Sequence, residues 1–154
     1  MRQLDNALAR AETVALALLV LAMTGVTFAQ VVARYFFGTP LIWSEEAARY
    51  LFVWVAMFGA ALATRQGTHY ALTALVERLP AAVQAWSRVV AVVVSGFFLI
   101  VLLLTGIEEM MQAHMQDAAT LPMRMSVPYA ALPVGATLML LHLALRVLGQ
   151  GPRA

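Results

Sequence analysis

Residues 34–50 read RYFFGTPLIWSEEAARY and lie between two long apolar segments. Gly38 and Pro40 are typical of a tight connection, because glycine adopts backbone angles closed to other residues and proline ends a helix. Ser44 is a favourable helix N-cap, and the two acidic residues after it would lie in a first turn, where the helix dipole favours anions. The stretch therefore predicts the end of one helix, a short loop and the start of a second helix.

Charged residues gather in this stretch, whereas residues 13–33 contain no Asp, Glu, Lys or Arg. Glu45 precedes Arg49 by four positions, which is the favoured order for an ion pair along a helix. Tyrosine and tryptophan rings collect at the level of lipid headgroups. The residues that we expect to lie together at one depth of a membrane are Arg34, Tyr35, Trp43, Glu45, Glu46 and Arg49. They form either an interfacial hairpin that is only anchored by its polar groups, or a docking surface for another membrane subunit.

The composition is that of an integral membrane protein. Of 154 residues, 62% are hydrophobic and 12% are charged, about half the charged fraction of soluble domains. A water-soluble fold of this length could not hide so much apolar surface. The net charge of +2 comes from few groups and suits flanks near anionic lipid, so we expect no nucleic-acid partner. The absence of cysteine excludes disulfides, thiolate metal sites and a cysteine nucleophile.

The sequence predicts one all-α membrane domain over residues 1–154 with four membrane-spanning helices. These are expected at about residues 13–33, 44–64, 89–107 and 126–145. A cleaved signal peptide is the alternative for the first segment, but its apolar run continues well past a possible cleavage site near Phe28. Pro133 is expected to kink the fourth helix, because proline removes a backbone hydrogen bond.

Residues 70–88 have a different pattern from the spans. Apolar residues recur there at helical spacing with polar residues opposite, and Pro80 interrupts the pattern. The pattern predicts an amphipathic helix, or a pair of helices, lying in the membrane interface. Ordinary loop helices packed on the bundle are the alternative.

Small residues form one stripe in each of the first two helices. The first stripe is Gly25, Ala29 and Ala33, and the second is Ala56, Ala60 and Ala63 beside Gly59. Small residues allow close approach of helices in membranes, so we expect these two helices to pack on each other.

Arginine counts predict the orientation. Seven of the ten basic residues lie in the N-terminal segment, the loop between the second and third helices, and the C-terminal tail. Loops rich in Lys and Arg stay in the cytoplasm. Both termini are therefore expected to be cytoplasmic, with residues 34–49 at the outer face.

Residues 34–50 resemble the start of the second helix in the small membrane subunit of TRAP transporters, the DctQ-like family. The matching residues are Arg34, Tyr35, Gly38, Trp43, Glu45, Glu46, Arg49, Gly59, Arg65, Gly67 and His69, followed in the last helix by Pro128, Tyr129, Leu132, Pro133 and Gly135. The resemblance implies a scaffold subunit of the bacterial inner membrane. Its partners would be a large DctM-like membrane subunit, which holds the substrate and sodium sites, and a periplasmic binding protein for an organic acid.

The four apolar cores lack Asp, Glu, Lys and Arg. Proteins that move ions or anionic substrates place ionisable residues at mid-depth or break their helices there, so the pattern favours support of transport over transport itself. A small self-assembling channel or exporter and a membrane-embedded enzyme are the alternatives, but no clustered catalytic set is visible.

The histidines predict no cofactor or metal site. His114 and Asp117, with Glu108 and Glu109 upstream, lack the tight pairing of metal motifs. His142, near the end of the last span, is expected to bind a partner helix or to reach the interface.

Overall fold

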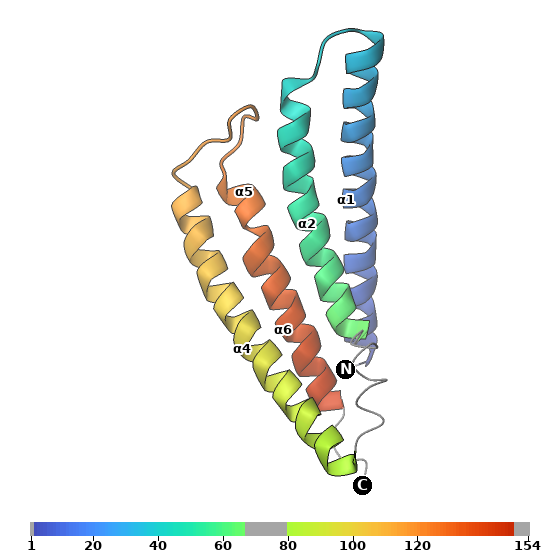
Figure 1. Ribbon diagram of the computed structural model, residues 1–154, viewed down its shortest axis with the longest axis vertical. Helices are drawn as coiled ribbons and strands as arrows, with labels where there is room; N and C mark the ends of the chain where they lie inside the picture. The colour runs from blue at the N-terminus through green and yellow to red at the C-terminus, as the bar shows by residue number, and fades with distance from the viewer. Residues whose placement is uncertain (1, 67–79, 150–154) are drawn as a thin grey trace.

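The computed structural model describes residues 2–66 and 80–149 (Figure 1). Its elements are α1 (Arg2–Phe36), α2 (Ile42–Gln66), α4 (Ala81–Ala113), α5 (Ser126–Tyr129) and α6 (Ala131–Gly149). Four segments are long and apolar enough to span a membrane, namely Ala7–Phe36, Ile42–Gln66, Val89–Ala113 and Ser126–Leu148. No strand occurs in the described ranges, apart from one isolated bridge between Asp117 and Arg124. The predicted all-α membrane fold with four spans is confirmed.

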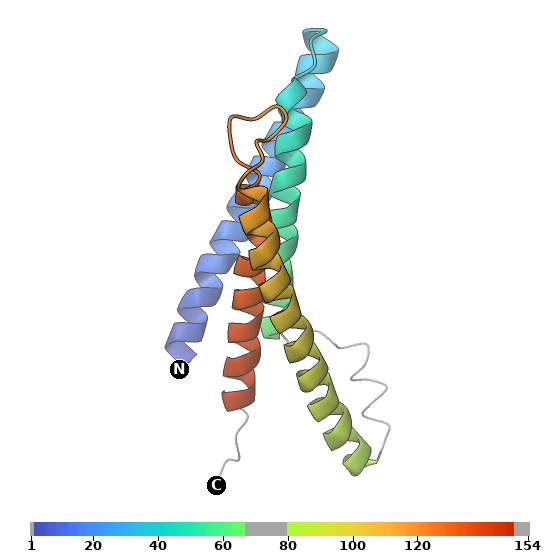
Figure 2. The same cartoon turned by 90° about the vertical axis from the view of Figure 1, so that its left-hand side faces the viewer.

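The four long helices stand in a row rather than around a common centre. α1 packs on α2, α2 on α6, and α6 on α4. Figure 2 shows that the lower ends of α1, α6 and α4 spread apart. We call the end with the start of α1 and the end of α6 the terminal end; the loop end carries the connections 37–41 and 114–125 (Figure 1).

Within the row, α2 and α6 approach each other closely at one point. A Cβ atom on Gly135 would lie 2.6 Å from Cε and 2.7 Å from Cβ of Met57, so any side chain here would force Met57 or its helix to move. Ala61, Ala131 and Ala136 are completely buried. The apolar cluster around them consists of Ala61, Leu99 and Met139, with Met57, Ala60, Leu102, Leu138, Leu140 and Leu143 packed against it.

The predicted packing of the first two helices on each other is confirmed, but part of the small-residue stripes lies outside the contact. Gly25 and Ala29 are exposed, and a Cβ on Gly25 or Gly59 would meet nothing within 4 Å. Ala33, Gly59 and Ala60 of the two stripes are partly buried. Periodicity shows which residues share a helix face, and it does not show which neighbour that face meets.

α4 is longer than the third predicted span at both ends. It begins at Ala81, directly after Pro80, so the last part of the predicted interfacial segment continues into the third span. Residues 67–79, the rest of that segment, lie outside the described residues. At the other end, Glu108 and Glu109 lie in the helix and not in the connection. Proline at a helix start costs nothing, because the N–H it lacks would have no partner there.

The fourth span breaks at Ala130, between α5 and α6. Pro133 has no N–H to donate to the carbonyl of Tyr129, four residues earlier. Ala130 N–H still bonds the carbonyl of Ser126 at 2.9 Å, and Val134 N–H bonds the carbonyl of Ala130 at 3.2 Å. The predicted kink near Pro133 therefore takes the form of this break.

Candidate functional site

The side chains that the sequence groups around the first connection separate into an exposed set and a buried one. Arg34 and Tyr35 lie in the last turn of α1, and Trp43, Glu45 and Arg49 lie in the first turns of α2. All five are exposed, Tyr35 to 79%. We call these five residues the loop-end surface.

The charges of the loop-end surface have no ion-pair partner in the part of the chain that the structure describes. The ion pair expected between Glu45 and Arg49 does not form within 4 Å, although the spacing along the helix is right. Exposed pairs of this kind contribute little energy, so their side chains are free to point elsewhere. Arg34, Glu45 and Arg49, unpaired among the described residues, thus remain available to another molecule.

The connection itself follows the predicted turn chemistry. Gly38 has a φ of +67°, a left-handed conformation that suits glycine. The carbonyl of Ala33 accepts hydrogen bonds from the N–H groups of Phe37 at 3.2 Å and Thr39 at 3.3 Å, and these bonds close the end of α1. Gly38 therefore shapes the hairpin that presents the loop-end surface.

Glu46 belongs to the same stretch but faces inward, with 8% of its surface exposed. Its carboxylate accepts hydrogen bonds from the backbone N–H of Ala119 at 2.9 Å and of Thr120 at 2.7 Å, and from the hydroxyl of Thr120. The Tyr50 hydroxyl donates a fourth bond at 2.5 Å. Four donors match the four acceptor sites of a carboxylate. Glu46 thus ties the start of α2 to the connection 114–125.

Two further polar contacts, one at Tyr50 and one at Ser44, lie near Glu46 at the start of α2. We call the hydrogen bonds of Glu46 to Ala119, Thr120 and Tyr50 the clamp. The Tyr50 oxygen also lies 2.9 Å from the sulfur of Met125, and since a hydroxyl has one proton, the carboxylate of Glu46 receives it in preference. Ser44 is completely buried, and its hydroxyl donates to the carbonyl of Leu41 at 2.6 Å. The helix begins two residues before Ser44, at Ile42, so the predicted N-cap role is wrong.

The remaining predicted residues lie elsewhere. Gly59 is in the middle of α2, and Arg65 is in its last turn at the terminal end. A helix of 25 residues is about 37 Å long, so Arg65 cannot take part in the loop-end surface. Gly67 and His69 lie outside the described residues.

Glu12 and His142 form a buried contact, of which the sequence predicted only that His142 binds a partner helix or reaches the interface. His142 Nε2 lies 3.0 and 2.9 Å from the two carboxylate oxygens of Glu12, and the two residues are 2% and 3% exposed. The contact joins α1 to α6 at the terminal end. An ionisable residue inside a span indicates a polar partner, so the sequence predicted a partner for His142. Nothing in the sequence around Glu12 identifies Glu12 as that partner.

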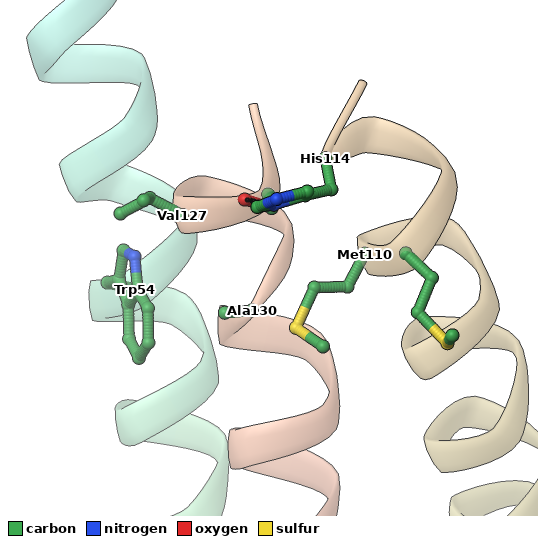
Figure 3. Close-up of a pocket in the computed structure, with 7 residues that line it drawn as sticks. Trp54, Met110, His114, Val127 and Ala130 are labelled. Atoms are coloured by element: carbon green, nitrogen blue, oxygen red, sulfur yellow. Dashed lines mark hydrogen bonds between the residues drawn. The ribbon is translucent and has the colours of Figure 1, made fainter. Parts of the chain in front are cut away.

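An open pocket of about 540 Å³ lies between α2, α4 and α5 (Figure 3). Figure 3 shows Trp54 of α2 and Met110 of α4 on opposite sides, with His114 across the top. His114 Nδ1 is 3.2 Å from the hydroxyl of Ser126. No charged residue lines the pocket, and no group of three or more potential metal ligands occurs among the described residues.

The sequence matches the family described as "Tripartite ATP-independent periplasmic transporters, DctQ component" over residues 23–151. The chain belongs to the DctQ family. A DctQ protein is a transporter component and not an enzyme, so this chain is a small membrane subunit of a TRAP transporter.

Individual relatives agree with this assignment. The sialic acid TRAP transporter small permease protein SiaQ of Vibrio cholerae is 31% identical over 124 residues, which are 79% of this chain and 70% of that protein. The C4-dicarboxylate TRAP transporter small permease protein DctQ of Rhodobacter capsulatus is 30% identical over 106 residues, 66% of this chain and 46% of that protein.

A larger relative extends the comparison. The sialic acid TRAP transporter permease protein SiaT of Haemophilus influenzae is 31% identical over 122 residues, 79% of this chain but 20% of that protein. The DctQ-like chain thus spans between a fifth and about half of the length of several curated relatives that it matches.

Proposed function

We propose that this subunit is the scaffold and membrane anchor of a sodium-driven transporter that takes up an organic acid. Its partners are a large DctM-like membrane subunit and a periplasmic solute-binding protein. The complex lies in the bacterial inner membrane, and both termini of the small subunit are cytoplasmic. The large subunit carries the substrate and sodium sites and performs the movement.

The observation that carries the proposal is the lack of charge in the middle of the spans. Residues 13–33, 50–64, 89–107 and 125–145 contain no Asp, Glu, Lys or Arg. A pathway for ions or organic acids needs ionisable or broken-helix sites at that depth. The helices also stand in a row rather than around a lumen. Both facts favour a support role over the alternative of a self-assembling channel.

The names of the relatives support an acid as substrate. They include transporters for sialic acid and for C4-dicarboxylates. Since this chain offers no charged binding site at mid-depth, the choice among such acids rests with the other subunits.

The loop-end surface is where the large subunit docks in this proposal. Arg34, Glu45 and Arg49 are exposed charges without an ion pair among the described residues. Charges of this kind at an interface set the partner and the register through complementary groups on the other side. Tyr35 and Trp43 add exposed aromatic area, and such residues are enriched at interfaces.

Co-purification tests the assignment. The tagged chain is extracted from its native membranes in mild detergent, and the proteins that accompany it are identified by mass. We expect a stoichiometric polytopic membrane protein. A lone chain or a stable homo-oligomer would overturn the scaffold assignment and favour the channel.

The variant Arg49→Ala tests the loop-end surface in the same assay. Loss of a charge paired across an interface is expected to lower recovery of the large subunit about tenfold or more. Arg146→Ala is the matched control, because Arg146 is also an exposed arginine but lies at the terminal end. Equal recovery with both variants would remove the loop-end surface from the interface and leave the family assignment intact.

A further inference from the structure

A second hollow lies at the terminal end, far from the loop-end surface. It has a volume of about 520 Å³ and is lined by Ala9, Arg10, Thr13, Val14 and Arg65. Arg10 comes from α1 and Arg65 from the last turn of α2, so each of two helices contributes one arginine to the lining of the same hollow. We propose that this basic pocket binds the phosphate of an anionic phospholipid headgroup.

The described lining of the pocket holds two arginines and no acidic residue, and the nearest acidic side chain in the described part of α1 is engaged elsewhere. Glu12 is buried, and its carboxylate contacts His142 of α6 at 2.9 and 3.0 Å. Arg10 is exposed and has no ion-pair partner among the described residues. Arg65 makes another interaction within the chain, and its guanidinium group has five N–H donors in all. Two guanidinium forks on one hollow match the planar, bidentate recognition of phosphate oxygens.

The position of the pocket favours a lipid over a free phosphate ion. Thr13 starts the uncharged run of residues 13–33, and Val14, one residue on, is 59% exposed. The hollow therefore spans the border between charged and hydrocarbon-facing surface within one helical turn. The Thr13 hydroxyl already donates to the carbonyl of Ala9 at 2.7 Å, so the arginines supply the donors for a ligand. A phospholipid fits this border, with its phosphate on the arginines and its acyl chains along α1.

The arginine distribution points to the same leaflet. Arg10, Arg65 and Arg146 lie at the terminal end, which is expected to face the cytoplasm. The cytoplasmic leaflet is the anionic one, and basic pockets between helices on that side bind anionic headgroups.

Native mass spectrometry of the full-length chain in detergent, with its large subunit if that co-purifies, tests the proposal. The probes are phosphatidylglycerol and phosphatidylethanolamine with identical acyl chains. We expect preferential binding of phosphatidylglycerol. Arg10→Gln and Arg65→Gln should each weaken it about fivefold, and the double variant should weaken it further than either single variant. Arg146→Gln, which removes an exposed arginine at the same end but outside the pocket, should bind as the unmodified chain does.

Each other outcome overturns the proposal. Equal binding of the two lipids by the unmodified chain means that the headgroup charge is not recognised. An equal loss with Arg146→Gln means that general surface charge attracts the lipid. Displacement of phosphatidylglycerol by an equal concentration of inorganic phosphate would assign the pocket to the free ion.

A second pair of variants covers a folding defect. If the glutamine variants lose helical signal by circular dichroism, Arg10→Lys and Arg65→Lys keep the charge and remove the guanidinium fork. We expect the lysine variants to bind phosphatidylglycerol several-fold more weakly, and unchanged binding would refute the role of the two forks. The result does not depend on co-purification of the large subunit, so the two proposals succeed or fail separately.

Discussion

Replacing Gly135 by alanine tests how closely α2 and α6 must approach. The new Cβ atom would lie 2.6 Å from Cε and 2.7 Å from Cβ of Met57. The Cε atom is the end of a flexible side chain and can move away, but the Met57 Cβ is fixed to the backbone of α2. Carbon atoms in ordinary contact are about 3.5–4.0 Å apart. The two helices must therefore separate by about 1 Å.

The cost of this separation follows from the packing around it. Ala61, Ala131 and Ala136 are completely buried, so the contacts that they make loosen when the helices move apart. Overpacking of this kind costs about 1–3 kcal/mol. Alanine is also a better helix former than glycine by about 1 kcal/mol. The net loss of stability for Gly135→Ala is therefore expected to be about 1 kcal/mol.

The variant Gly25→Ala is the matched control. A Cβ on Gly25 would meet nothing within 4 Å, so this change has the gain in helix propensity without the clash. The propensity terms cancel between the two variants, and the difference of about 1–3 kcal/mol isolates the close approach of α2 and α6. Thermal unfolding of the purified chain in detergent, followed by circular dichroism, measures it as a lower Tm for Gly135→Ala than for Gly25→Ala.

Equal Tm values for the two alanine variants would refute the reasoning. A partial test of the cause is the double variant Gly135→Ala with Met57→Ala, which removes the mobile end of Met57 but keeps its Cβ. We expect no rescue, because the fixed atom still collides. Full rescue would show that the flexible end alone carries the clash.

Two further predictions concern the polar contacts at the ends of the helices. His142→Leu leaves the buried carboxylate of Glu12 without its partner, so the free energy of unfolding should fall by about 3–5 kcal/mol. The double variant with leucine at both positions should recover most of this loss. Equal Tm values for the single and double variants would contradict the prediction. Glu46→Ala removes the acceptor for the N–H groups of Ala119 and Thr120, so hydrogen exchange at these two amides should become roughly tenfold faster or more. The Gln116 amide, which bonds the carbonyl of Ala113, is the control and should keep its exchange rate. Unchanged exchange at residues 119 and 120 would exclude the role of Glu46 in holding the connection 114–125.

The spans and the first connection were predictable because their signals are local. An uncharged run such as residues 13–33 has few options other than a membrane helix. Gly38 and Pro40 marked the turn between α1 and α2, and the positive φ of Gly38 is the conformation that its lack of a side chain permits. The break before Pro133 likewise follows from a hydrogen bond that proline cannot make.

The contacts between distant segments were not predictable from one sequence. Glu46 was singled out by its place in a first helical turn, but two of its donors are backbone N–H groups, and these have no residue-type signature. Glu12 and His142 are 130 residues apart, and neither belongs to a recognisable motif. The fit between Gly135 and Met57 depends on which helix faces meet, and this is set by the whole arrangement.

The contacts of Glu46, the contact between Glu12 and His142, and the close approach of α2 and α6 at Gly135 have a common physical reason. In lipid, apolar side chains gain little by leaving the bilayer for another helix, because hydrocarbon tails are as apolar as leucine. Large residues such as Phe28 and Phe97 can therefore remain exposed, at 69% and 71%. The row must be fixed by other means: Glu46 at the loop end, Glu12 with His142 at the terminal end, and small residues around Gly135 between them. Because these contacts use inward-facing groups, the outward charges at residues 34, 45 and 49 are not needed for the fold of the chain, and this is why a change such as Arg49→Ala can separate assembly from stability.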